Sequence, residues 1–187
     1  TVGALGIPLK PFADFNADQY GFHDTKLSSS IQNAFHAIAV DEHRKPYAAT
    51  LWQQQDQRDR DKGQVLEQVW FSGAHADVGG GYTGIHPISD LTLRWMQKKA
   101  LGCGLKNEIL PAPQEGPVLN VDIHDSFKDF LGGFFSFFTH RYYRVIGQEN
   151  EGPQAMDVSV RKRITAKNDY RPKNQGLFDI QEISDAW

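Results

Sequence analysis

The chain has 187 residues, 20 basic and 23 acidic, so it is slightly acidic and long enough for one domain with a substantial core. This nearly balanced charge gives no general reason to expect binding to nucleic acid or to an anionic membrane surface. The single cysteine, Cys103, excludes an internal disulfide, and the longest apolar patch, residues 130–138, is far shorter than the ~20 residues of a membrane-spanning helix.

Apolar patterning predicts alternating strands and helices in the first part of the chain. Residues 1–5 form an apolar run that predicts a strand, and because the chain opens inside it we expect more sequence upstream. Residues 28–44 predict a helix, since apolar residues recur at helical spacing behind a serine cap. Residues 64–71, rich in Val, Trp and Phe, predict a buried strand, and residues 88–102 predict a second helix.

The second part of the chain gives weaker signals. Residues 112–120 contain Pro and Gly and predict a break, while residues 156–164 predict either a strand or the start of a helix. The aromatic segment 127–147 predicts either a packed core element or an apolar lid that contacts a lipid surface. In that segment, Arg141 and Arg144 are candidates for a phosphate head group or for ordinary solvated charges. Strands alternating with helices predict an α/β domain with a mostly parallel sheet.

The sequence GAHADVGGGY, residues 73–82, holds the main candidate site. It follows the predicted strand directly, and the loops after the carboxyl ends of parallel strands are where chemistry collects. His75 is the candidate general base there, and Asp77 is expected to accept hydrogen bonds from the glycine amides and fix the turn. The residues expected to shape the site are Gly79, Gly80, Gly81 and Tyr82. The alternative is a structural turn with an incidental histidine.

A phosphate-binding loop is a further interpretation of the glycines. The segment lacks the Lys-Ser/Thr pair of a P-loop and the glycine spacing of a dinucleotide fingerprint, so the sequence does not favour it.

Residues 121–127, VDIHDSF, hold a second group of polar side chains. Asp122, His124 and Asp125 could form a metal cluster with His140, or a second acid–base site. Metal sites usually take ligands from more than one element, so the sequence favours no metal here. His124 is therefore the second candidate for a catalytic histidine.

Several other polar positions have structural interpretations. His36 is expected to be a core or boundary histidine. Asp41 and Glu42 are expected to form ordinary ion pairs with Arg44 at the end of the first predicted helix, and Ser89 or Asp90 to cap the second.

Seven segments along the chain resemble one known family. In order they are TVGALGIP, AFHAIAVDEHR, LWQQQ, QVWFSGAHADVGGGY, ISDLTLRWM, SVRKRI and YRP. Their order and spacing are similar to the α/β-hydrolase-like family that includes the type VI secretion phospholipase effectors of bacteria, with fungal relatives. The resemblance implies a partial α/β-hydrolase-like fold, with residues 1–187 as the C-terminal portion of one catalytic domain, and no cofactor.

The resemblance also implies a Ser…Asp…His triad in that chain order. The family's serine lies in a Gly-x-Ser-x-Gly motif, and no serine of this chain has those flanking glycines. The family's aspartate lies in a Trp-Asp-Thr-Val stretch, which would place it directly before Thr1. The matching histidine is His75, so we expect the chain alone to be inactive and the nucleophile to lie upstream.

The function implied by the resemblance is hydrolysis of lipid carboxylic esters by an A-type phospholipase. A phospholipid or other lipid ester would be the substrate, with membrane-surface contact through residues 127–147 and an immunity or secretion-machine protein as partner. The protein would be made in the cytoplasm and exported to a target cell by a type VI system. The alternatives are a non-catalytic interaction module and an esterase for small soluble esters.

Overall fold

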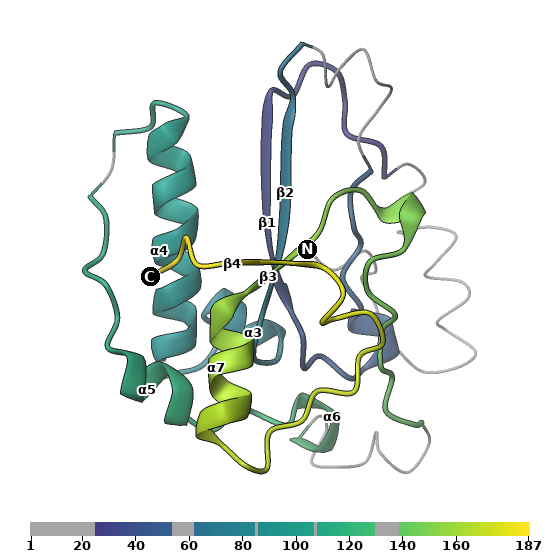
Figure 1. Ribbon diagram of the computed structural model, residues 1–187, viewed down its shortest axis with the longest axis vertical. Coiled ribbons are helices and arrows are strands. Elements are labelled where there is room, and N and C mark those ends of the chain that lie inside the picture. Colours follow the sequence, from purple (N-terminus) through teal and green to yellow (C-terminus); the bar gives the residue numbers. More distant parts are fainter. Residues whose placement is uncertain (1–24, 54–61, 85, 107, 130–138) are drawn as a thin grey trace.

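The protein is described by a computed structural model that covers residues 25–53, 62–84, 86–106, 108–129 and 139–187 (Figure 1). Its centre is a four-stranded parallel sheet in the order β1-β2-β3-β4. The strands are β1 (Asn33–Ala39), β2 (Val65–Phe71), β3 (Ala155–Asp157) and β4 (Gln181–Ile183). The predicted α/β class with a parallel sheet is therefore confirmed. The strand expected at residues 1–5 lies outside the described residues.

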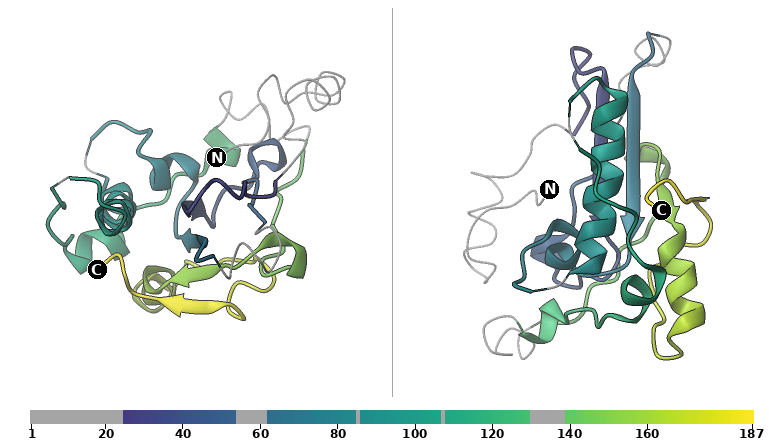
Figure 2. Two further views of the ribbon diagram at one scale, coloured as in Figure 1. Left: turned by 90° about the horizontal axis from the view of Figure 1, so that it is seen from above. Right: turned by 90° about the vertical axis from the view of Figure 1, so that its left-hand side faces the viewer.

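Helices lie on both faces of the sheet. The α-helices are α3 (His75–Gly79), α4 (Pro87–Gly102), α5 (Glu115–Asn120), α6 (Ser126–Asp129) and α7 (Val158–Ala166), and the 3-10 turns are η1 (Lys45–Tyr47) and η3 (Glu149–Glu151). The long helix α4 runs beside β1 and β2, and α7 follows β3 directly (Figures 1 and 2). No helix in these stretches is long and apolar enough to span a bilayer.

The two faces of the sheet carry separate apolar clusters. Ile38, Trp70 and Met156 are neighbours across three strands and face the cluster that contains Val160 of α7. The alternate residues of β2, Val69 and Phe71, face the opposite way. That second cluster also contains Ile88, Leu91 and Trp95 of α4, with Val118 and Leu119 of α5. Because both faces are covered, the central strands are apolar on both sides.

The predicted helix at residues 28–44 is wrong, because this segment contains β1. Apolar residues such as Phe35 and Ile38 fit helical spacing, but Ile38 pairs in register with Trp70 of β2. A strand covered on both faces is apolar throughout, so periodicity does not separate it from a buried helix. This correction matters for the site, because it puts the residues after Ala39 at the carboxyl edge of the sheet.

Two of the other predicted elements are confirmed. The strand at 64–71 corresponds to β2, and the helix at 88–102 corresponds to α4. That helix begins at Pro87 with His86 at the cap position, so the expected Ser89 or Asp90 cap is wrong. The break expected at 112–120 contains the short helix α5 instead, and residues 156–164 hold both alternatives, the end of β3 followed by α7.

Candidate active site at the carboxyl edge of the sheet

Asp41 joins the carboxyl ends of β1 and β2 through hydrogen bonds of its backbone and its side chain. Asp41 donates its backbone N–H to the Gly73 carbonyl (3.0 Å), and its buried carboxylate accepts the Gly73 N–H (2.7 Å) and the Tyr170 hydroxyl (2.9 Å). Gly73 has φ +119°, and a Cβ there would lie 2.8 Å from the Asp77 Cβ. Glycine is therefore required at position 73, where the chain turns from β2 into α3.

His75, the main candidate, binds a buried carboxylate. It opens α3, and its Nδ1 lies 2.5 Å from Oε2 of Glu42, which follows β1. The Glu42 side chain is only 4% exposed. Burial opposes its ionisation, but hydrogen bonds from Arg44 and His75 outweigh this and lower the pKa of Glu42 to about 2. Glu42 is therefore ionised and can only accept, so His75 Nδ1 carries the proton and donates it.

Three further side chains hold this pair. Arg44 forms two parallel bonds to Glu42, from Nε to Oε1 and from Nη2 to Oε2, each 2.8 Å long. Ser126 donates its hydroxyl to the same carboxylate at 3.1 Å. Tyr47 lies under the Arg44 guanidinium, 4.0 Å from ring centroid to Cζ, and its ring stacks on His75 at 5.7 Å. Nη2 of Arg44 also lies 3.0 Å from Nδ1 of His75, but both atoms donate, so this contact is not a hydrogen bond.

The far side of the His75 ring is accessible. Its side chain is 41% exposed, and within the described ranges no group forms a hydrogen bond with Nε2. The ring borders a cavity of about 190 Å³, whose wall is the outer edge of β1 together with parts of η1 and α3. The lining residues are His36, Ala37, Ile38, Ala39, Glu42, Tyr47, Ala49, His75, Val78 and Gly79. An imidazole held at Nδ1 and open at Nε2 can accept a proton from a group that enters this cavity.

The second candidate, His124, also binds a buried carboxylate. Its Nδ1 lies 2.6 Å from Oδ1 of Asp77, and its backbone N–H donates to Oδ2 (3.2 Å). Asp77 also accepts the Ala74 N–H at 2.9 Å. The expectation that Asp77 binds the amides of Gly79–Gly81 is therefore wrong. The Tyr82 ring stacks on His124 with the centroids 3.6 Å apart.

A three-residue stretch, His124–Ser126, connects the two histidine–carboxylate pairs. We call it the bridging segment. His124 binds Asp77 of α3, and Ser126 binds Glu42, the carboxylate that also binds His75. Asp125 between them forms an ion pair with Arg141. The bridging segment thus fixes Asp77 and Glu42 relative to each other across the carboxyl edge of the sheet.

The glycines of the loop have different roles. Gly79 is the last residue of α3 and lines the cavity next to His75. Gly80 has φ +80° and ends that helix in the left-handed conformation, which glycine adopts without strain. Gly81 packs against Ala76, where an added Cβ would approach the Ala76 Cβ to 3.0 Å. Of the three, Gly79 alone borders the cavity, and Tyr82 belongs with the second pair.

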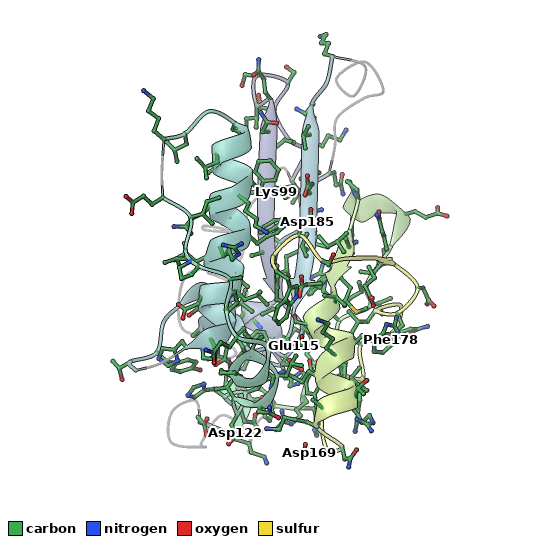
Figure 3. All side chains as sticks on the ribbon, turned by 60° about the vertical axis from the view of Figure 1, so that its left-hand side comes forward. Lys99, Glu115, Asp122, Asp169, Phe178 and Asp185 are labelled. Atoms are coloured by element: carbon green, nitrogen blue, oxygen red, sulfur yellow. The ribbon has the colours of Figure 1, made fainter. Side chains whose placement is uncertain are left out.

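The residues of the hypothetical metal cluster are not brought together. Asp122 lies at the surface and pairs with Lys167 at 2.7 Å (Figure 3), while Asp125 pairs with Arg141 and His124 with Asp77. In the described part of the chain, no three His, Cys, Asp or Glu side chains form a group that could hold a metal ion.

Two arginines and one histidine named from the sequence also have internal partners. Arg144 binds Glu151 at 2.5 Å and the Ala49 carbonyl at 2.8 Å, so neither it nor Arg141 is a solvated charge. His36 is 4% exposed, as expected of a core histidine, and burial lowers its pKa to about 4. In the aromatic segment Phe127 is buried, while residues 130–138, the centre of the proposed lid, lie outside the described residues.

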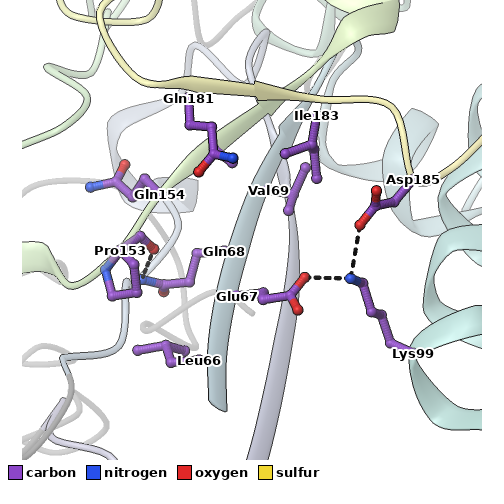
Figure 4. Close-up of a pocket in the computed structure, with 11 residues that line it drawn as sticks. Leu66, Glu67, Gln68, Val69, Lys99, Pro153, Gln154, Gln181, Ile183 and Asp185 are labelled. Atoms are coloured by element: carbon purple, nitrogen blue, oxygen red, sulfur yellow. Dashed lines mark hydrogen bonds and ion pairs between the residues drawn. The ribbon is translucent and has the colours of Figure 1, made fainter. Parts of the chain in front are cut away.

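A second and larger cavity lies elsewhere. It has a volume of about 330 Å³ and lies at the amino-terminal half of β2, between β2, β3 and β4 (Figure 4). Its charged side chains are paired with one another, because Lys99 binds both Glu67 (2.6 Å) and Asp185 (3.0 Å). It holds no histidine or serine, and it lies toward the opposite ends of the strands from His75. The smaller cavity therefore remains the candidate active site.

Glu42 is the site residue that sequence reasoning did not identify as such. It was expected to form an ordinary ion pair with Arg44, and that pair is present but buried. Glu42 could have been recognised if residues 33–39 had been predicted as a strand. Because β1 runs parallel to β2, the residues that follow both strands, Glu42 and His75, lie at the same edge of the sheet.

Comparison with known proteins identifies a family for the chain. Residues 1–99 match the family model described as "T6SS, Phospholipase effector Tle1-like, catalytic domain". These 99 of 187 residues include β1, β2, α3 and the Glu42–His75 pair, and they end inside α4. Comparison with curated proteins and with solved structures gives no significant match.

A parallel α/β sheet with a histidine–carboxylate pair at its carboxyl edge is an arrangement found in many hydrolases. The match defines the class further, and the chain belongs to the family of Tle1-like phospholipase effectors of the type VI secretion system, within their catalytic domain.

Proposed function

We propose that this chain supplies the general base of a serine hydrolase that cleaves carboxylic esters of phospholipids, as an A-type phospholipase, and that His75 is this base. The single observation that carries the proposal is the contact of 2.5 Å between Nδ1 of His75, which lines a cavity, and the buried carboxylate of Glu42. The position of His75 inside the matched catalytic domain supports it further.

The proposed reaction needs a nucleophile from another part of the protein. The 187 residues contain no Gly-x-Ser-x-Gly motif, so in this proposal the serine is upstream and residues 1–187 are the C-terminal portion of an α/β-hydrolase-like domain. His75 Nε2 takes the serine proton as Oγ attacks the ester carbonyl. It then protonates the departing alcohol oxygen of the lysophospholipid, which leaves an acyl-serine. A water molecule, deprotonated by the same nitrogen, releases the fatty acid.

The test compares two histidine variants in the longest natural polypeptide that contains this chain. His75→Ala should lower phospholipid hydrolysis by at least about 10³-fold without unfolding the protein, because the serine loses its proton acceptor. Release of fatty acid from phosphatidylethanolamine–phosphatidylglycerol vesicles measures this activity. The 187-residue chain alone should release none.

His124→Ala is the matched control, because His124 also binds a buried carboxylate. Its loss should leave most of the activity, since His124 lies outside the matched residues and outside the cavity next to His75. The opposite result, an active His75→Ala protein and an inactive His124→Ala protein, would move the base to His124 and Asp77. Activity in both variants would mean that neither histidine is the base, and absence of activity in the parent protein would favour a non-catalytic interaction module.

The substrate class is tested with the same protein. Vesicle hydrolysis that exceeds hydrolysis of 4-nitrophenyl butyrate supports a phospholipase, whereas the reverse order supports an esterase for small soluble esters. Acyl-chain release without head-group release supports the A-type assignment.

We also propose an immunity protein as partner and export by a type VI system, and both proposals rest on the family alone.

A further inference from the structure

The turn that carries His75 is tied to a residue almost a hundred positions away in the sequence. Gly73, two residues before His75, bonds to Asp41, and Asp41 accepts the hydroxyl of Tyr170. We propose that Tyr170 is a positioning residue of the active site, which acts through Asp41 and Gly73 to fix the place of His75. This inference rests on the proposed function of His75.

The first argument is the directness of the link. The N–H of Gly73 and the hydroxyl of Tyr170 donate to the same oxygen, Oδ2 of Asp41, at 2.7 and 2.9 Å. The backbone N–H of Asp41 also donates to the Gly73 carbonyl at 3.0 Å. Both backbone polar groups of Gly73 are therefore bonded to one residue, and Tyr170 fixes the side chain of that residue.

The second argument is that the turn at Gly73 has little freedom to adjust. Its φ of +119° belongs to a region that glycine adopts without strain, and an added Cβ would lie 2.8 Å from the Asp77 Cβ. Helix α3 begins only two residues later, at His75. A shift of Gly73 therefore moves the start of α3 and the imidazole with it, and small misplacements of a reacting group are costly for catalysis.

The third argument is that Asp41 depends on Tyr170. Its carboxylate is buried, and an ionised carboxylate there needs hydrogen-bond donors. Within the described ranges its donors are the Gly73 N–H and the Tyr170 hydroxyl. The ion pair with Arg44 that was expected of Asp41 is wrong, because Arg44 binds Glu42 instead.

The protonation state of Asp41 depends on the same hydroxyl. Burial raises the pKa of Asp41, whereas the bonds from Gly73 and Tyr170 and the more distant charges of His43 and Arg163 lower it. Without the Tyr170 hydroxyl, Asp41 therefore takes up a proton at a higher pH. A protonated carboxyl is a weaker acceptor for the Gly73 N–H, so the turn loosens.

Tyr170 itself is held by the packing around α7. Its N–H donates to the Lys167 carbonyl at 3.1 Å, and its ring packs against the apolar cluster that contains Val160. The Arg163 guanidinium lies 5.7 Å from the ring centroid. Tyr170 lies outside the 99 matched residues, so in this proposal the later part of the chain contributes to the geometry of the site.

The experiment replaces Tyr170 by Phe in the longest natural polypeptide that contains the chain. Phe keeps the ring in its apolar cluster and removes only the hydroxyl. We expect kcat on phospholipid vesicles to fall by about 10- to 100-fold with KM nearly unchanged, because a misplaced base impairs the chemistry and not substrate binding. Parent-like kcat would overturn the proposal.

Tyr143→Phe is the matched control. The Tyr143 ring stacks on His43 at 4.8 Å, and in the part of the chain that the structure describes its hydroxyl forms no hydrogen bond. We expect this variant to keep kcat within about threefold of the parent, because it removes no bond that the turn needs. Equal losses in the two variants would overturn the proposal.

The pH dependence gives a readout that a packing defect would not move. The ratio of parent kcat to Tyr170→Phe kcat should be larger at pH 6 than at pH 8, because Asp41 takes up its proton at higher pH in the variant. Asn at position 41 still offers an oxygen to Gly73 but binds no proton. In the Asp41→Asn background the effect of Tyr170→Phe should therefore be the same at both pH values. A ratio that does not change with pH in the native background would overturn the proposal.

A second variant breaks the link at its other end, which decides the question if Tyr170→Phe does not fold. Asp41→Ser shortens the side chain and removes the acceptor of the Gly73 N–H. We expect it to lower kcat at least about tenfold with KM nearly unchanged. Parent-like kcat in this variant would overturn the proposal as well.

The results separate the inference from the function on which it rests. Activity in His75→Ala contradicts the proposed function. An inactive His75→Ala protein together with a fully active Tyr170→Phe protein contradicts only the role of Tyr170.

Discussion

Asp157 is a buried carboxylate whose ionisation works against the fold. It is fully buried at the end of β3, where Oδ1 accepts the Ser159 N–H at 2.8 Å and caps α7. Burial raises its pKa to about 6, against 3.8 in an exposed position. Because the folded state holds this proton more tightly than the unfolded state, the contribution of Asp157 to stability is greatest below about pH 4 and is lost as pH rises through 6.

Asp157→Asn should therefore stabilise the protein at neutral pH but not in acid. Asn caps helices as well as Asp does, so the comparison isolates the charge. The difference in unfolding free energy between variant and parent should grow by about 3 kcal/mol from pH 4 to pH 7, since each pKa unit is worth about 1.4 kcal/mol. Urea unfolding at several pH values measures it. Asp122→Asn is the control, because Lys167 lowers the pKa of exposed Asp122 and gives the opposite sign. Equal slopes for the two variants would contradict the argument.

Single residues of the site were partly predictable from the sequence. His75 was identified because glycines after a strand mark a loop, and Gly73 and Gly80 do adopt positive φ there. The partner of His124, Asp77, was not identified, because 47 positions separate the two in sequence. Contacts of this kind come from the way loops fold back over a sheet edge, and residue type and spacing do not encode them.

At the scale of elements, α4 shows which face of a helix supports the fold. Leu91 and Leu93 are two positions apart on α4, but Leu91 is 1% exposed in the apolar cluster and Leu93 is 49% exposed. Leu91→Ala should lower the unfolding free energy by about 2–5 kcal/mol, and Leu93→Ala by less than about 1 kcal/mol, because only the first leaves a cavity. Denaturant unfolding of both variants measures the difference. Similar losses would mean that α4 packs with another face inward.

Elements differ in how well the sequence predicts them. Helix α4 was predicted to within one residue, because its apolar face packs on the sheet and its outer face is polar. Strand β1 was predicted as a helix, since burial on both sides removes the alternation that marks a strand. That error hid Glu42, because a helix ending there would have given it no fixed relation to β2. Strands β3 and β4 have three residues each, too few for a periodic signal.

At the scale of the whole molecule, the matched residues depend on the rest of the chain. The family match ends at residue 99, but both apolar clusters include residues beyond it. Val118, Leu119 and Ala186 complete one face of the sheet, and Met156, Val160 and Leu177 are part of the other. A chain truncated after Gly102 should therefore lose cooperative unfolding, because the Trp70 face of β2 would lose Met156, Val160 and Leu177 while α4 alone covered the other face. Circular dichroism during thermal unfolding, with the 187-residue chain as control, measures this. A sharp transition in the truncated chain would show that the matched part folds alone.

The global arrangement was predictable only as a class. Alternating strands and helices predicted a parallel α/β sheet, and the order β1-β2-β3-β4 agrees with it. That β3 comes from residues 155–157, more than 80 positions after β2, was not predictable, because three apolar or acidic residues in a row have no distinctive pattern.

The bridging segment has a mechanical consequence. His124 and Ser126 are two positions apart, so at most about 7 Å of backbone joins them, and peptide geometry does not let that length stretch. Each end is tied to a different buried carboxylate. The short backbone between His124 and Ser126 therefore limits how far Asp77 and Glu42 can move apart when a molecule presses on either histidine.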